Sequence, residues 1–236
     1  MIDWGWVVDH LDDLVGRTIQ HLLFASISLV IGFGISFLLA LWSVNQRRVY
    51  APITVVTGIL YTIPSLALFA ALVPITGLSI ATAVIPLVLY TLLILVRNIV
   101  AGFDAVPRDV EEAADGMGYT RRQRLQAVDM PLALPLIVAG IRVASVSTIG
   151  LVTITGALGE RFGGLGFFIF EGYRRSFPTE ILFGAIPSMV LAIAVDLALV
   201  AVQGRMTPWS HEQPDAGMGS MDQVTAGGAS GAEAGT

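Results

Sequence analysis

The chain is organised around one short polar stretch, EEAADGMGYTRRQR at residues 111–124. It lies between two long apolar runs, and it predicts two short helices joined by a glycine turn; we call residues 104–131 the elbow. Pro107 is placed to start the first helix, and the carboxylates that follow would lie against the positive end of the helix dipole. Gly116 and Gly118 are expected to break this helix, because glycine adopts left-handed backbone angles at little cost. A chain that keeps such a polar elbow is expected to present it to a partner.

The second arm of the elbow carries its own start and stop signals. Thr120 and Gln123 have the spacing of a capping box, in which each side chain bonds the backbone N–H of the other residue. Pro131 is expected to stop or bend the helix that follows, because proline disfavours the helical conformation of the residue before it. Two short arms set at an angle are therefore predicted.

The overall composition indicates a membrane protein. Of 236 residues, 55% are hydrophobic and only 13% are charged, whereas a soluble domain carries about 25% charged residues. The formal net charge of −5 is small and the basic residues are scattered, so nucleic-acid binding has no support. Cysteine is absent, which excludes disulfides and thiolate metal ligands.

Lysine is absent as well, and all 13 basic residues are arginine. A phosphate-binding loop of the G-x-x-x-x-G-K-[ST] type needs its lysine, so this chain cannot carry that ATP site. No cofactor is therefore predicted on this chain, and any ATP-driven step requires ATP and Mg²⁺ on a partner subunit.

Five apolar runs approach the roughly 20 residues that a helix needs to cross the hydrocarbon core. They lie at residues 21–42, 53–73, 78–96, 134–155 and 181–202. Pro64, Pro86 and Pro187 fall inside runs two, three and five and predict kinks, which helices in lipid tolerate when neighbouring groups bond the freed carbonyls. The predicted fold is all-α, a polytopic membrane protein with about five transmembrane helices and the elbow between runs three and four.

Three parts of the chain and an orientation follow. Residues 1–17 are expected to lie on the external membrane surface, residues 18–206 to form the transmembrane domain, and residues 207–236 to be a disordered cytoplasmic tail. Arginines predominate on one side of this topology and place the N-terminus outside and the elbow and C-terminus in the cytoplasm. The cytoplasmic set is Arg47, Arg48, Arg97, Arg108, Arg121, Arg122, Arg124 and Arg205, and the external set is Arg17, Arg161, Arg174 and Arg175.

The elbow resembles the EAA loop of ABC-importer permeases. From Glu112 the sequence reads E-A-A, three residues, Gly118, nine residues and then V-D-M-P at residues 128–131, where the family has an I-x-L-P-like group. The motif lies before the last two spans, where the family places it. The resemblance implies an ATPase-coupling role for the following residues: Glu111, Glu112, Ala113, Ala114, Gly116, Gly118, Thr120 and Pro131.

Flanking segments are similar to the branch of this family that imports glycine betaine, choline, carnitine and related osmoprotectants. They lie at residues 96–102, 132–142, 183–187 and 194–197, and the resemblance covers roughly residues 18–208. It implies a permease subunit of the bacterial plasma membrane, paired with a second permease that is identical or homologous. It also implies two ATPase subunits and an extracellular or lipid-anchored solute-binding protein. A permease for another small polar solute, such as an amino acid, is the alternative within the family.

The residues of the elbow are physically consistent with docking on a partner. Ala113 and Ala114 leave one helix face thin, so backbone could approach a groove closely while Glu111 and Glu112 pair with arginines there. On spacing alone, a solvated loop with ordinary caps is equally consistent.

Two ionisable residues lie deep in the predicted spans. Arg142 is in run four and Asp196 in run five, each about 10 Å from the cytoplasmic end of its helix. An ionised side chain at a helix centre costs about 2.5–3.5 kcal/mol on the insertion scale. We predict that the two pair with each other; the alternative is that each faces a water-filled vestibule or snorkels.

Four aromatic residues in the spans are candidates for the solute pathway, because aromatic faces attract a quaternary ammonium cation. They are Trp42, Tyr61, Phe69 and Tyr90. Such residues more often serve packing, and the main recognition site is expected on the binding protein. The glycine-rich stretch at 159–170 is too short to span, and it is either a re-entrant turn or a connector.

Two other classes of protein fit the sequence less well. An intramembrane enzyme has no support, because His10, His21 and His211 cannot form an H-E-x-x-H site and no G-x-S-x-G motif is present. An autonomous channel or secondary transporter often has internal repeats with matching broken helices, and the five runs show no convincing repeat. No catalytic residue and no metal site are predicted.

Overall fold

The structure is a computed structural model that describes residues 2–206. Within this range the chain is helical and contains no strand, as the sequence predicts. The α-helices are α1 (Trp4–Asp9), α2 (Leu11–Asn45), α3 (Tyr50–Thr62), α4 (Ser65–Thr76), α5 (Ile80–Asp104), α6 (Arg108–Gly116), α7 (Arg121–Arg124), α8 (Met130–Val152), α9 (Gly166–Arg174) and α10 (Pro178–Met206). Shorter segments are the 3-10 helices η1 (Arg47–Val49) and η3 (Thr153–Leu158) and the π-helix η2 (Leu125–Asp129).

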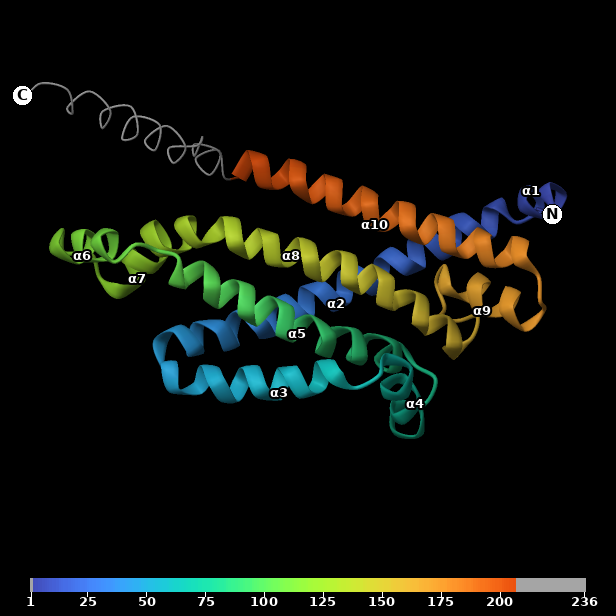
Figure 1. Cartoon of the computed structure of the whole chain (residues 1–236), viewed down its shortest axis with the longest axis horizontal. Helices are drawn as coiled ribbons and strands as arrows, with labels where there is room; N and C mark the ends of the chain where they lie inside the picture. The colour runs from blue at the N-terminus through green and yellow to red at the C-terminus, as the bar shows by residue number, and fades with distance from the viewer. Residues whose placement is uncertain (1, 207–236) are drawn as a thin grey trace, which may run out of the picture.

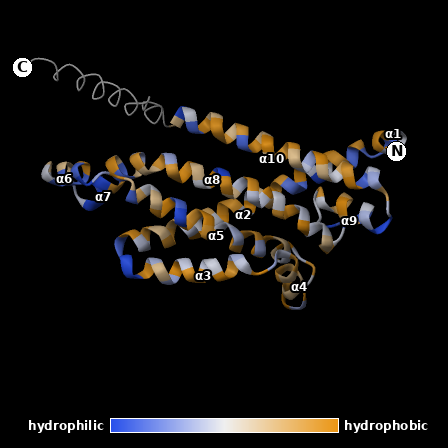
Figure 2. Ribbon diagram, viewed as in Figure 1, coloured by the Kyte–Doolittle hydropathy of each residue, from blue (hydrophilic) through white to orange (hydrophobic). Residues whose placement is uncertain are grey.

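The long helices α2, α5, α8 and α10 run roughly along the long axis of the molecule (Figure 1). Helices α6 and α7 lie at one end, and α1 and α9 lie at the other. Figure 2 shows that the long helices are mainly hydrophobic, whereas hydrophilic residues gather in α6 and α7. The elbow is therefore separated from the N-terminal helix by the length of the apolar bundle.

Helix α5 forms the centre of the bundle and packs against α2, α3 and α8. In its most apolar stretch 61% of the residues are buried, compared with 6% for α10, so α10 lies on the outside. Leu87, Leu95 and Ile99 on α5 are completely buried and belong to the two apolar clusters of the core. The apolar surface that α10 leaves uncovered is suited to lipid or to another chain.

The predicted second span is broken rather than kinked. Helices α3 and α4 meet at 92°, and the four long helices together with this bent pair give the predicted total of five spans. The break occurs because Pro64 lacks an N–H and disfavours helical angles at Ile63, which is extended. The Tyr90 hydroxyl donates to the Ile63 carbonyl and so gives this backbone group a hydrogen-bond partner at the break. Pro86 and Pro187, by contrast, lie inside the continuous helices α5 and α10.

The first long helix begins earlier than the apolar run predicts. It starts at Leu11 rather than at residue 21, and its 35 residues give a length of about 50 Å, more than the hydrocarbon core requires. Helix α1 precedes it and is capped by Asp3, whose side chain accepts from the Trp6 N–H. The Trp6 ring packs against Phe183, with ring centroids 5.2 Å apart, so α1 is held against the protein. Its place on the external membrane surface stays a prediction.

The glycine-rich stretch after α8 is folded into η3, a short loop and α9. Gln20 on α2 fixes the loop by bonding its backbone twice, because its amide donates to the Arg161 carbonyl at 2.6 Å and its carbonyl accepts from the Gly164 N–H at 3.0 Å. Gly164 has a positive φ of 49°, and Leu165 is completely buried. Re-entry of the segment at 159–170 into the bilayer stays a prediction beside the alternative of a connector. The predicted tail at 207–236 lies outside the described residues.

Candidate functional site

The elbow forms the end of the molecule that lies farthest from α1 (Figure 1). Its first helix, α6, begins after Pro107, which is the N-cap, as the sequence predicts. Asp109 and Glu111 lie in the first turn, where negative charge is favourable.

A glycine C-cap ends α6, and only one of the two predicted glycines supplies it. Gly118 has a φ of +82°, and its N–H donates to the Asp115 carbonyl while the Tyr119 N–H donates to the Ala114 carbonyl. This pair of bonds is the Schellman arrangement, which needs a left-handed residue at the position of Gly118. Gly116 is still helical, so the expectation that it breaks the helix is wrong.

The second arm begins with the predicted capping box and then continues past its predicted end. The Thr120 N–H donates to Gln123 Oε1 at 2.8 Å, and the Gln123 N–H donates to Thr120 Oγ1 at 3.4 Å. The chain then runs through the π-turn η2 into α8, so the helix does not stop at Pro131; the expected alternative, a bend at this residue, stays a prediction. The Met130 N–H bonds the Leu125 carbonyl five residues earlier, and this wider turn relieves the clash that a proline ring causes in an α-helix.

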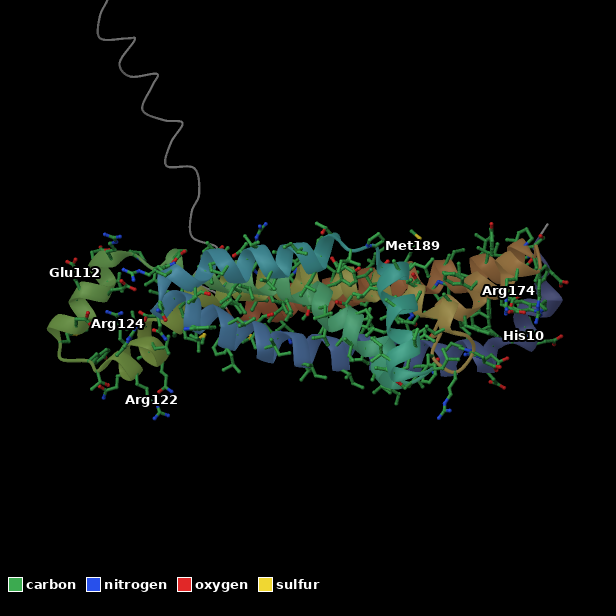
Figure 3. All side chains as sticks on the ribbon, turned by 90° about the horizontal axis from the view of Figure 1, so that it is seen from below. His10, Glu112, Arg122, Arg124, Arg174 and Met189 are labelled. Carbon is green, nitrogen blue, oxygen red and sulfur yellow. The ribbon has the colours of Figure 1, made fainter. Side chains whose placement is uncertain are left out.

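The face of the elbow that carries the E-A-A residues is only partly available to a partner. Glu112 and Ala113 are exposed, and Figure 3 shows Glu112 at the outer edge of α6. Ala114 is only 1% exposed, so the expectation that both alanines form a thin docking face is corrected for this residue. Glu111 is half-buried and lines a cavity inside the elbow. Glu112 and Ala113 are therefore the motif residues best placed for contact with another chain.

An arginine holds the elbow together from within, and the sequence analysis missed it. Arg124 Nη1 donates to Asp115 Oδ2 at 2.7 Å, and its Nε lies 3.5 Å from Asp129 Oδ2. Burial alone would lower the pKa of Arg124, but the neighbouring carboxylates of Asp129, Asp115 and Glu111 outweigh it and raise the pKa. No simple signal could have found this network, because its members are five and nine residues apart and neither spacing is a helical neighbour.

Two further polar contacts attach the elbow and its surroundings to the bundle. Arg47 after α2 forms an ion pair with Asp104 at the end of α5, and this hydrogen bond raises the pKa of Arg47. Arg121 of α7 donates to the Asn45 side chain at the end of α2. Between these contacts lies a cavity of about 270 Å³. It is lined by Leu41, Val44, Asn45, Arg47, Phe103, Glu111, Arg121, Arg124, Leu125 and Asp129.

The two charges in the predicted spans form the ion pair that the sequence suggests. Arg142 Nε donates to Asp196 Oδ1 at 3.0 Å, and Arg142 Nη2 donates to Asp196 Oδ2 at 3.2 Å. Arg142 Nη1 also donates to Gln203 Oε1 at 3.2 Å. This bidentate contact joins α8 to α10 and balances each charge within the apolar bundle.

The four candidate pathway aromatics do not form one site. Tyr61 and Tyr90 lie edge to face with ring centroids 5.8 Å apart, beside the break between α3 and α4. Phe69 is 1% exposed within an apolar core cluster, which is the ordinary packing role. Trp42 is 52% exposed, and its indole N–H donates to Gln46 at 3.3 Å. Among residues 2–206, no three His, Asp or Glu side chains are grouped as metal ligands.

Known proteins of similar sequence cover most of the chain. The choline transport system permease protein OpuBB of Bacillus subtilis is 31% identical over 83% of this chain and 89% of its own length. The osmoprotectant import permease protein OsmW of Salmonella typhimurium is 34% identical over 86% of this chain and 96% of its own.

Solved structures share the fold. An inward-facing form of the MetNI methionine ABC transporter has a chain with a TM-score of 0.75 and 21% identity, covering 84% of this chain and 98% of that one. An amino acid ABC transporter with histidines gives a TM-score of 0.70 and 16% identity, covering 87% and 99%. At these identities the likeness concerns the fold alone.

The family itself follows from a match that spans the whole bundle. Residues 23–208 match the family described as "Binding-protein-dependent transport system inner membrane component". The match includes the elbow and every long helix except the first turns of α2. The chain therefore belongs to the permease family of binding-protein-dependent ABC importers and is a multi-pass transport subunit of the plasma membrane.

Proposed function

We propose that this permease translocates compatible solutes with a quaternary ammonium group, such as glycine betaine, choline or carnitine. One observation carries the proposal: relatives whose names specify choline, carnitine or osmoprotectant transport are 31% to 35% identical to this chain over 82% to 86% of its length. Residues in the spans therefore match these relatives, and the resemblance is not confined to the elbow.

The proposed complex contains two permeases, two ATPase subunits and a solute-binding protein. The second permease is a copy or a homologue of this chain, and the exposed, apolar outer surface of α10 is suited to contact with it or with lipid. The ATPase subunits bind ATP and Mg²⁺ and dock on the elbow through the exposed Glu112 and Ala113. The binding protein delivers solute at the opposite end, where α1 and α9 lie.

The proposed orientation puts the elbow in the cytoplasm and the N-terminus outside. Arginines support it, since Arg47, Arg108 and Arg121 belong to the larger set near the elbow, and the smaller set near α9 includes Arg161 and Arg174. An odd number of spans then leaves the end of α10 on the cytoplasmic side.

The test is solute-dependent stimulation of ATP hydrolysis in the reconstituted complex. The permease is purified with its ATPase, placed in proteoliposomes and supplied with binding protein loaded with glycine betaine, choline, carnitine or an amino acid. We expect stimulation and uptake with the quaternary ammonium solutes and none with a binding protein loaded with an amino acid. Stimulation by the amino acid alone would contradict the proposed substrate class. Uptake without the ATPase would contradict the importer mechanism.

A further inference from the structure

We propose that Arg124 is a positioning residue for transport: it ties α6, α7, the π-turn η2 and the start of α8 into one unit that moves together. The inference rests on the proposed function, because it requires an ATPase that moves α6. It concerns how that movement reaches the membrane helices, which the position of the elbow alone does not explain.

Arg124 links three consecutive parts of the elbow, because it belongs to one of them and contacts the other two. It is the last residue of α7, Asp115 lies in the last turn of α6, and Asp129 is the last residue of η2 before α8 begins. The guanidinium is 2.7 Å from Asp115 and 3.5 Å from Asp129. A forked guanidinium can hold two carboxylates in fixed directions, which a point charge cannot do as well. Any rotation of α6 therefore acts on η2 through this side chain.

The contact with Asp129 depends on the π-turn. Residues five apart in an α-helix point about 140° apart around the axis, because each residue turns the chain by about 100°. A turn bonded between residues i and i+5 brings such residues close to the same face, and the Met130 N–H to Leu125 carbonyl bond is of this kind. The pair Arg124–Asp129 therefore fits the π register and would be lost if the segment became α-helical.

The network is incompletely satisfied in this conformation. Asp129 is only 8% exposed, yet its Oδ1 has no hydrogen-bond partner within the described residues, and neither does Arg124 Nε at hydrogen-bond distance. Buried polar groups nearly always have partners. A slightly shorter contact would give Arg124 Nε a hydrogen bond to Asp129 Oδ2, whereas Asp129 Oδ1 would still need a partner of its own.

The ion pairs of Arg124 act beside other contacts between the elbow and the bundle. Behind Arg124 is the cavity of about 270 Å³, which separates α6 and α7 from the ends of α2 and α5. Arg121 crosses this region by donating to Asn45, and Leu125 of η2 packs against the apolar core cluster formed by α2, α5 and α8. Helix α6 also packs within the elbow, where Ala114 is 1% exposed. The ion pairs of Arg124 add a direct charged connection from Asp115 of α6 to Asp129 at the start of α8.

The test compares two neighbouring arginines in the complete complex. Arg122 lies on the same short helix, is exposed and has no ion pair within residues 2–206; Figure 3 shows it pointing outward while Arg124 lies between the arms. Solute uptake and ATP hydrolysis are measured in the same proteoliposomes. Arg124→Gln is expected to lower the ratio of solute imported to ATP hydrolysed by at least about fivefold, the lower end of typical coupling between sites. Arg122→Gln is expected to leave that ratio unchanged, whatever happens to either rate.

A second variant and a second readout keep the test independent of folding. Arg124→Lys retains the charge but not the fork, so its ratio should fall between those of the wild type and Arg124→Gln. Because the chain lacks cysteine, spin labels attached to the substitutions Met117→Cys and Leu132→Cys, both at exposed positions, report the distance between the elbow and α8. We expect that distance to be the same with and without ATP in the wild type and to change with ATP in Arg124→Gln.

The outcomes separate this inference from the function on which it rests. Equal ratios for Arg124→Gln and the wild type, or a fixed label distance in both, would overturn the role of Arg124 alone. A wild-type chain that forms no complex with an ATPase would overturn the proposed function, and the role of Arg124 with it.

Discussion

Removing one member of the Arg142–Asp196 pair should destabilise the permease more than removing both. The two side chains share hydrogen bonds of 3.0 and 3.2 Å, and about a third of each is exposed, 30% for Arg142 and 33% for Asp196. A lone charge near a helix centre costs about 2.5–3.5 kcal/mol. Because of the partial exposure and the remaining contact of Arg142 with Gln203, we expect each single change to leucine to lower the free energy of unfolding by about 2 kcal/mol.

The double change Arg142→Leu with Asp196→Leu should lower the free energy of unfolding by only about 1 kcal/mol, because apolar pairs often replace buried ion pairs at little cost. The coupling energy is then about 3 kcal/mol, the upper end for residues in contact. Reversible unfolding of the purified permease in mixed micelles, followed by tryptophan fluorescence, measures it. A charge swap, Arg142→Asp with Asp196→Arg, should recover part of the loss. Additive single effects and no recovery in the swap would refute the pairing.

Glycine positions give two further predictions, each with a control in the same element. Gly118→Ala should lower the free energy of opening of the elbow by about 1–2 kcal/mol, because its φ of +82° is unfavourable for a residue with a side chain. The control Gly116→Ala, inside helix α6, should stabilise the elbow. Hydrogen exchange of the elbow amides measures both effects. Gly140→Ala should lower the free energy of unfolding by about 1–3 kcal/mol, because the new Cβ would lie 2.4 Å from Asn98 Cβ. The control Gly150→Ala should not lower the free energy of unfolding, because a Cβ there meets nothing within 4 Å. Equal effects at the two sites would contradict the close contact between Gly140 of α8 and Asn98 of α5.

Local signals in the sequence were enough to predict much of the elbow. Each of these signals acts on backbone groups only a few residues away, so it can be recognised from neighbouring residues alone. They are Pro107, the acidic first turn, Gly118 and the Thr120–Gln123 capping box. The same holds for the apolar runs, since helix length and hydrophobicity alone decide whether a segment is suited to lipid. The family resemblance rests on these local features, and the comparison with known permeases confirms it.

Errors occurred where packing or backbone register decided the outcome. Ala114 is buried by its own chain instead of lying on a docking face, and a π-turn carries the second arm past Pro131. Pro64 predicted a kink, but the observed angle of 92° also depends on the Tyr90 hydroxyl that bonds the Ile63 carbonyl. None of these features follows from residue type or from spacing along the chain.

The sequence by itself determined that this chain is an all-α membrane protein with five apolar runs and a capped polar elbow. Only the tertiary structure decided that Arg124 joins Asp115 to Asp129 and that the glycine-rich loop after α8 is fixed by Gln20. The Arg142–Asp196 pair lies between these cases, because the sequence indicated two charges at similar depth but could not choose between a pair and separate solvation. The physical reason is the range of the interactions: caps and hydrophobicity act on neighbouring residues, whereas ion pairs between helices depend on how those helices pack.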